Sequence, residues 1–279
     1  MEINVEKIAV IRNFCVRRLF FSSVLFAIAG LATGSALAAD FLMCSPQIAP
    51  WTYVASSRND HKIFAGPYPE LKEELALRSG YSIELIVMPY ARMVEQLKQG
   101  TCDFTWTLWS ANRASYALRG TTFLMLEFGV MARPGISLKK YSDLEGLKIV
   151  VPRGVKVSSE FDKDKAIEKF PVVDYLQGLR MLNHNRAHGI AGTFLTFNYH
   201  FKKMGRANIL QDRLPLKTLP VSFVYSLKSK KLSDRKLLDI TMANMVKAGT
   251  VGRIIEKWFG AGSARLPDDP MEGVDWNKD

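Results

Sequence analysis

The chain has 279 residues, of which 48% are hydrophobic and 11% aromatic, and this composition excludes a disordered protein. Its 38 basic and 27 acidic residues give a formal net charge of +11 at pH 7. A chain of this length can bury one large core or two of ordinary size.

Residues 1–38 have the three parts of a secretory signal peptide. The apolar run 19–32 follows a basic head, and small residues precede the expected cleavage after Ala38. A membrane anchor is the alternative, but a bilayer-spanning helix needs ~20 apolar residues and this run is shorter. Cys44 follows large residues, unlike the cysteine of a lipid-anchored protein. We expect export without a lipid anchor. The basic residues of the head are Lys7, Arg12, Arg17 and Arg18.

The charge has a different meaning in an exported protein. Without residues 1–38, the chain keeps 34 basic and 25 acidic residues, a net charge of +9. Inside a cell this excess would favour nucleic acid as a partner. Outside the cytoplasm we expect no nucleic acid; the charge favours anionic ligands or an acidic surface, or only keeps a monomeric protein soluble.

Cys44 and Cys102 remain after cleavage. An oxidising compartment favours a disulfide between them. Each also lies beside a strand-like run, where a free cysteine behaves as a small core hydrophobe. A disulfide needs Cα atoms within roughly 7 Å, so the spacing leaves both interpretations open.

The first half of the mature chain alternates strand and helix patterns. An apolar run at 41–44 and a loop at 46–53 come first. The periodicity then predicts helices at 69–78 and 90–98, and strands at 81–88 and 103–108. This alternation favours a parallel sheet with right-handed crossovers.

A second unit of the same kind follows. It has predicted strands at 147–151 and 172–175, predicted helices at 158–170 and 177–183, and a small-residue stretch at 187–193. The apolar runs 123–132 and 221–227 are expected to cross between the two units, and helices are expected at 234–247 and 252–259. We therefore expect lobe 1 at 39–131 and 225–279, and lobe 2 at 132–224.

The motifs resemble those of family 3 periplasmic solute-binding proteins of ABC transporters, the polar amino acid class. The resemblance covers nearly the whole mature chain. It implies an α/β, two-lobed type II periplasmic binding protein fold, with the ligand cleft between lobes joined by two crossing strands. The motifs are Met88-Pro89-Tyr90-Ala91-Arg92, Lys98-Gln99-Gly100 before Cys102-Asp103, Asn112-Arg113, Tyr141-Ser142-Asp143-Leu144-Glu145-Gly146-Leu147, Arg153-Gly154, and Gly249 to Gly260.

The resemblance assigns ligand contacts in lobe 1. Arg113 matches the arginine that grips the ligand carboxylate, because a planar guanidinium holds both carboxylate oxygens. The alternative is an exposed arginine on a helix. Aromatic side chains that cover the apolar part of a ligand, or alternatively pack in the core, are Tyr90 and Trp51 or Tyr53. Further candidates that could line the ligand cleft beside Arg113 are Thr107, Trp109 and Ser110.

In lobe 2 the chain departs from the family pattern. A second glycine and a serine usually follow the glycine of the loop at Gly154, but Lys156 and Val157 stand there. An anion site could still use Lys156, Ser158 and backbone N–H groups, although Ser158 alternatively serves only as a helix N-cap. Thr193 stands where amino acid binders place an aspartate for the ligand ammonium. Either another acid serves, or the ligand lacks an amino group.

These observations favour a periplasmic binding protein that captures a small anionic or zwitterionic solute, an amino acid or related carboxylate, for an inner-membrane ABC permease. We expect a monomer without cofactor, metal or catalysis. His184 and His188 have the i, i+4 spacing of a metal pair but no accompanying acid, so we expect surface histidines. The alternatives are an exported enzyme similar to cyclohexadienyl dehydratases, and a ligand-sensing receptor component.

Overall fold

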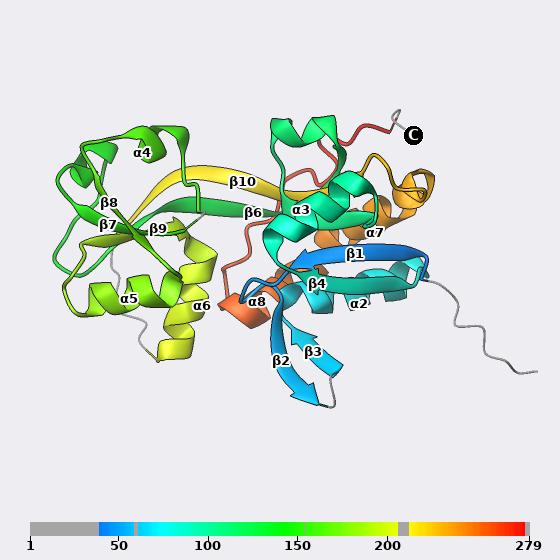
Figure 1. The fold of residues 1–279 in the computed structure, drawn as a ribbon, viewed down its shortest axis with the longest axis horizontal. Helices are drawn as coiled ribbons and strands as arrows, with labels where there is room; N and C mark the ends of the chain where they lie inside the picture. The colour runs from blue at the N-terminus through cyan, green and yellow to red at the C-terminus, as the bar shows by residue number, and fades with distance from the viewer. Residues whose placement is uncertain (1–38, 59–60, 154, 206–211, 277–279) are drawn as a thin grey trace, which may run out of the picture. The chain divides into compact units, whose positions relative to one another are not determined.

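The computed structural model describes residues 39–58, 61–153, 155–205 and 212–276 (Figure 1). The expected signal peptide and Gly154 lie outside the described residues. Each helix in the described part of the chain is too short or too polar to cross a membrane.

Eight strands form one mixed sheet in the order β4-β1-β5-β10-β6-β9-β7-β8. β1 is parallel to β4 and β5, and β7 is parallel to β8 and β9, as the strand and helix alternation predicts. The α/β class is confirmed. The strands are β1 (Phe41–Pro46), β4 (Ile83–Met88), β5 (Phe104–Leu108), β6 (Ala117–Ala132), β7 (Lys148–Pro152), β8 (Glu168–Val172), β9 (Gly189–Thr193) and β10 (Arg213–Ser226).

The helices alternate with these strands. The α-helices are α2 (Pro67–Ser79), α3 (Tyr90–Gln99), α4 (Ser159–Lys163), α5 (Tyr175–Asn183), α6 (Phe194–Met204), α7 (Arg235–Lys247) and α8 (Thr250–Phe259). Short 3-10 helices are η1 (Ala111–Ser115), η2 (Tyr141–Leu144) and η3 (Leu232–Asp234).

Two long antiparallel strands, β6 and β10, connect the two parts of the sheet (Figure 1). Residues 221–225 of β10 pair with β5, whereas residues 128–132 of β6 pair with β9. Both strands are longer than the apolar runs 123–132 and 221–227, because the ladder of backbone hydrogen bonds continues into polar sequence. The expected lobe boundaries stay a prediction, and we keep the terms lobe 1 and lobe 2 for those ranges.

Three sequence predictions fail locally. The helix predicted at 158–170 ends at Lys163, because Asp164 is extended and its side chain accepts the Ala166 N–H. The strand predicted at 172–175 is β8, a few residues earlier. The region 53–65, expected as loop and polar connection, forms the hairpin of β2 (Tyr53–Arg58) and β3 (His61–Ala65).

A disulfide joins Cys44 at the end of β1 to Cys102 just before β5, with Cα atoms 5.8 Å apart. Both residues are buried in a small cluster with Met88 and Met93, which come from β4 and α3. The disulfide therefore links β1 to the start of β5, beside α3, and these last two elements lead to or carry the lobe 1 candidates.

Candidate functional site

Arg113 lies in η1, the turn that follows β5, and its guanidinium is held by three hydrogen bonds. Nε donates to the Leu108 carbonyl at 3.2 Å, and Nη1 donates to the Tyr116 hydroxyl at 3.0 Å. Nη2 donates to the Tyr90 hydroxyl at 2.5 Å. The three acceptors come from β5, the residue after η1, and the first residue of α3. The local fold thus orients the guanidinium before any ligand arrives.

These contacts leave capacity for an anion. A guanidinium has five N–H groups, so one N–H on each terminal nitrogen of Arg113 lies outside the three hydrogen bonds above. Both acceptor side chains are neutral phenols, and Arg113 takes part in none of the ion pairs within the described residues. A guanidinium that keeps an N–H on each terminal nitrogen and has no ion-pair partner can still bind a carboxylate.

The other lobe 1 candidates around Arg113 differ in exposure. The side chain of Tyr90 is 42% exposed, so part of its ring is open beside the guanidinium. Ser110 is exposed, and its backbone carbonyl accepts the Arg113 backbone N–H. Thr107 is buried in β5 opposite Ser222, and Trp109 packs at the edge of a buried cluster. The structure therefore brings the Tyr90 side chain to the Arg113 guanidinium, links Ser110 to Arg113 only through the backbone, and buries Thr107.

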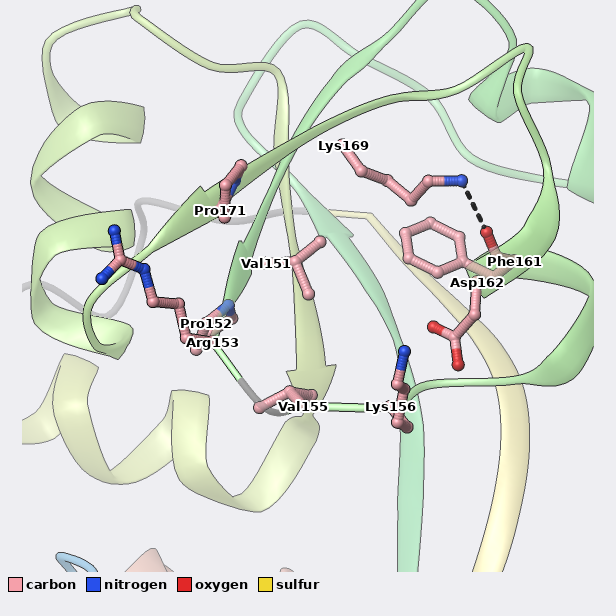
Figure 2. A pocket seen from close by; sticks show the side chains of 9 residues that line it. All are labelled: Val151, Pro152, Arg153, Val155, Lys156, Phe161, Asp162, Lys169 and Pro171. Atoms are coloured by element: carbon pink, nitrogen blue, oxygen red, sulfur yellow. Dashed lines mark hydrogen bonds between the residues drawn. The ribbon is translucent and has the colours of Figure 1, made fainter.

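In lobe 2, the loop after β7 borders a pocket of about 300 Å³ (Figure 2). Lys156 is exposed and lines it, whereas Ser158 is the N-cap of α4 and accepts the Phe161 N–H at 3.2 Å. The N-cap role expected as the alternative for Ser158 is therefore present. The lining residues are Val151, Pro152, Arg153, Val155, Lys156, Phe161, Asp162, Lys169 and Pro171.

Thr193 ends β9 and is buried in a neutral polar cluster. Its hydroxyl donates to the Thr196 hydroxyl at 2.6 Å. Burial raises the pKa of Tyr175 to about 12, although its hydrogen bonds with Thr193 act to lower it. His200 stacks on the Tyr175 ring at 6.0 Å, and burial lowers its pKa. The side chains gathered at Thr193 are therefore uncharged at neutral pH.

The close packing of Tyr175 in this cluster explains why residue 192 is a glycine. Its φ is +155°, and a Cβ there would lie 2.6 Å from the Tyr175 hydroxyl oxygen. Only glycine allows the Tyr175 ring this approach to the end of β9.

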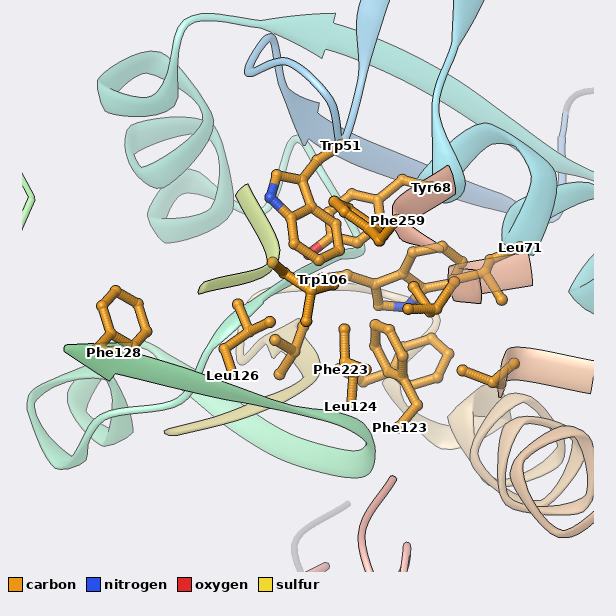
Figure 3. Close-up of a cluster of buried hydrophobic side chains, with 14 of the residues drawn as sticks. Trp51, Tyr68, Leu71, Trp106, Phe123, Leu124, Leu126, Phe128, Phe223 and Phe259 are labelled. Carbon is orange, nitrogen blue, oxygen red and sulfur yellow. The ribbon is translucent and has the colours of Figure 1, made fainter. Parts of the chain in front are cut away.

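Trp51 and Tyr53 pack against other aromatic rings. Trp51 is 8% exposed, and its ring lies 5.2 Å from Tyr68 and 5.1 Å from Phe259 (Figure 3). Tyr53 meets Trp258 edge-on at 6.2 Å. Burial raises the pKa of Tyr53, and the nearby Tyr199 adds to the rise. The packing alternative considered for Trp51 is what the structure shows around its ring.

The two histidines that have the spacing of a metal pair differ in their surroundings. His188 Nδ1 accepts the Lys148 backbone N–H at 2.8 Å, and His184 is exposed. Among the described residues, no group of three or more His, Cys, Asp or Glu side chains is placed to hold a metal.

Sequence reasoning missed two groups of contacting residues. Tyr116, three residues after Arg113, could have been found from its helical spacing. Tyr175 and His200 carry no local signal, because only the tertiary fold brings α5 and α6 to the end of β9.

Comparisons with a family model and with solved structures support this architecture. The family model described as bacterial extracellular solute-binding proteins, family 3, matches residues 43–261. A comparison with curated proteins found no match.

Solved structures resemble the chain in fold. The second substrate binding domain of GlnP from Lactococcus lactis, in an open conformation, is 17% identical, with 80% of this chain and 95% of that chain covered and a TM-score of 0.60. AbpA, an amino acid ABC transporter substrate-binding protein from Streptococcus pneumoniae bound to L-arginine, is 14% identical, covering 78% and 93%, with a TM-score of 0.60. A histidine kinase sensor domain with similarity to periplasmic binding proteins is 17% identical, covering 81% and 96%, with a TM-score of 0.61. The two-lobed fold is confirmed.

Proposed function

The chain belongs to the bacterial extracellular solute-binding proteins of family 3, and on this premise we propose that it captures a small anionic or zwitterionic solute for an ABC importer. The solute is an amino acid or a related carboxylate, bound between the lobes in the periplasm. The observation that carries the proposal is Arg113, an oriented guanidinium with no carboxylate partner among the described residues.

The side chains around Arg113 have separate roles in this proposal. Arg113 holds the solute carboxylate through its two remaining terminal N–H groups. Tyr90 fixes Nη2 and offers its exposed ring to the apolar part of the solute. Residues of lobe 2, with Lys156 and Thr193 as candidates, complete the site when the lobes close.

The test is calorimetry on the protein without residues 1–38. A thermal-shift screen of amino acids and organic acids first finds a stabilising solute, because a ligand that binds only the folded state raises the unfolding midpoint. Arg113→Ala is expected to weaken that solute by more than tenfold. Arg92→Ala removes an exposed arginine on α3 and serves as the matched control. Equal affinity of wild type and Arg113→Ala would refute the assignment.

Sensing is a second candidate, favoured by the likeness to a histidine kinase sensor domain. Deletion of the gene separates the two roles. Loss of uptake of the labelled solute supports the importer, whereas normal uptake with a lost transcriptional response supports the sensor.

We propose binding without turnover. Incubation of the solute with purified protein, followed by NMR, is expected to return it unchanged. Formation of a product would favour the enzymatic alternative on the same fold.

A further inference from the structure

We propose that the solute has two anionic groups and no ammonium group, and that the pocket beside Lys156 in lobe 2 binds the second anion. This inference rests on the proposed function, because Arg113 of lobe 1 is taken to hold the first anion. Two independent observations carry it: the charge of the pocket, and the neutrality of the cluster at Thr193.

The pocket has an excess of positive charge. Three cationic side chains and one carboxylate line its volume of about 300 Å³ (Figure 2). Lys169 is already engaged, since its ammonium donates to the backbone carbonyls of Phe161 and Asp164. Its charge still adds to the positive potential of the pocket, but its donors are largely satisfied.

Arg153 and Lys156 are the cations that an anion can recruit. Both are exposed, and neither takes part in an ion pair within the described residues. The lining carboxylate, Asp162, accepts the Val157 backbone N–H at 3.3 Å on one oxygen. The two exposed cations therefore lie in the loop at the carboxyl end of β7, and the one carboxylate that lines the pocket, on α4, already accepts a backbone hydrogen bond. Carboxyl ends of parallel strands are where ligands bind in α/β sheets.

The cluster at Thr193 gives no counter-charge to an ammonium. A buried ammonium needs a carboxylate or several strong acceptors. Thr193 donates its own hydroxyl proton to Thr196, and the adjacent Tyr175 and His200 are neutral. Asp174 acts on His200 electrostatically, but its side chain is exposed and accepts the Gln177 N–H as the N-cap of α5.

The two observations combine into a solute class. A ligand ammonium would gain nothing at Thr193 and would be repelled by Arg153 and Lys156. A second carboxylate or a phosphonate would lose no contact at Thr193 and would reduce the positive charge of the pocket. The shared chemistry is a compact dianion, and carboxylate and phosphonate probes distinguish its two forms.

The experiment is calorimetry with matched probes at one ionic strength. Succinate, glutarate and adipate supply two carboxylates at increasing separation, and 3-phosphonopropionate supplies a phosphonate. Butyrate lacks the second anion, and L-glutamate adds an ammonium to glutarate. At least one dianion is expected to bind tenfold or more tightly than both butyrate and L-glutamate.

The variants assign the second anion to the pocket. Lys156→Met is expected to weaken the best dianion about tenfold and to weaken butyrate much less. Lys165→Met removes an exposed lysine outside the pocket and is the matched control. Thr193→Asp is expected to reverse the preference between glutarate and L-glutamate.

The outcomes separate this inference from the proposed function. L-glutamate or a monocarboxylate that binds best, with Arg113 dependence but no Lys156 dependence, overturns the dianion and leaves solute capture intact. L-glutamate bound more tightly than glutarate by wild type would overturn the exclusion of an ammonium group. Binding of a dianion that Arg113→Ala does not weaken overturns the role of Arg113 in both.

Discussion

The cations of the two lobes differ in how they are held. Three hydrogen bonds fix Arg113 in lobe 1, whereas Arg153 and Lys156 in lobe 2 are exposed and form no ion pair within the described residues. A fixed group loses little conformational entropy when a ligand binds, but an exposed lysine or arginine loses more. If Arg113 holds the solute as proposed, we expect lobe 1 to bind it first and the exposed cations of lobe 2 to become ordered on contact with it.

Removal of the disulfide in lobe 1 is expected to have the largest effect on stability. Cys44→Ser/Cys102→Ser removes a bridge between residues 58 positions apart, next to the elements that carry Tyr90 and Arg113. The chain-entropy model of a loop of this length predicts a loss of about 4 kcal/mol in the free energy of unfolding. Urea unfolding of wild type and double variant measures it. Intact-mass analysis after alkylation without reductant, which should leave wild-type Cys44 and Cys102 unmodified, is the control; equal unfolding midpoints would contradict the prediction.

The pH dependence of lobe 1 provides the next test. Asp239 is fully buried in α7 and accepts the Thr121 backbone N–H at 2.6 Å. Burial raises the pKa of Asp239 to about 6, although the hydrogen bonds with Thr121 and the charge of Arg235 act to lower it. An unfolded aspartate has a pKa of about 3.9.

The sign of the effect follows from these two pKa values. Between pH 4 and 6 the folded protein binds more protons than the unfolded chain at this position, so stability falls as pH rises. The difference of about two between the folded and unfolded pKa values of Asp239 corresponds to about 3 kcal/mol in the free energy of unfolding. Asp239→Asn should remove this part of the slope in urea unfolding between pH 4 and 6, whereas Asp268→Asn, an exposed control, should keep it. A slope unchanged in Asp239→Asn would show that Asp239 does not titrate in this range.

Much of the fold could be predicted from the sequence, because the strands and helices of the two units have clear hydrophobic periods. The hairpin at 53–65 could not, since more than half of the residues in this range are polar and its two strands pair only with each other. The helix predicted at 158–170 failed because Asp164 offers the backbone a competing hydrogen bond that a periodicity search ignores.

The candidate site divides in the same way. Arg113 and Tyr90 could be nominated from motifs, and the structure places their side chains in contact. The pocket beside Lys156 needed the fold, because Lys169 and Phe161 reach it from separate elements. The role of every nominated residue in binding stays a prediction.

Tyr90→Phe tests the organisation of Arg113 with the smallest change. It removes one hydroxyl and with it the 2.5 Å hydrogen bond from Nη2, while the ring that would face the solute remains. A hydrogen bond to a charged group contributes about 1.5–3 kcal/mol, and water can replace part of it at this half-exposed position.

We therefore expect roughly a tenfold loss of affinity for the solute, measured by calorimetry, with the unfolding midpoint almost unchanged. Tyr141→Phe is the matched control, because it deletes a tyrosine hydroxyl that donates to Asp164 in lobe 2, away from Arg113. If Tyr90→Phe binds as tightly as wild type, the Leu108 carbonyl and Tyr116 are sufficient to orient the guanidinium. If Lys156→Met then costs more affinity than Tyr90→Phe, the exposed cations of lobe 2 contribute more to binding than the organisation of lobe 1 does.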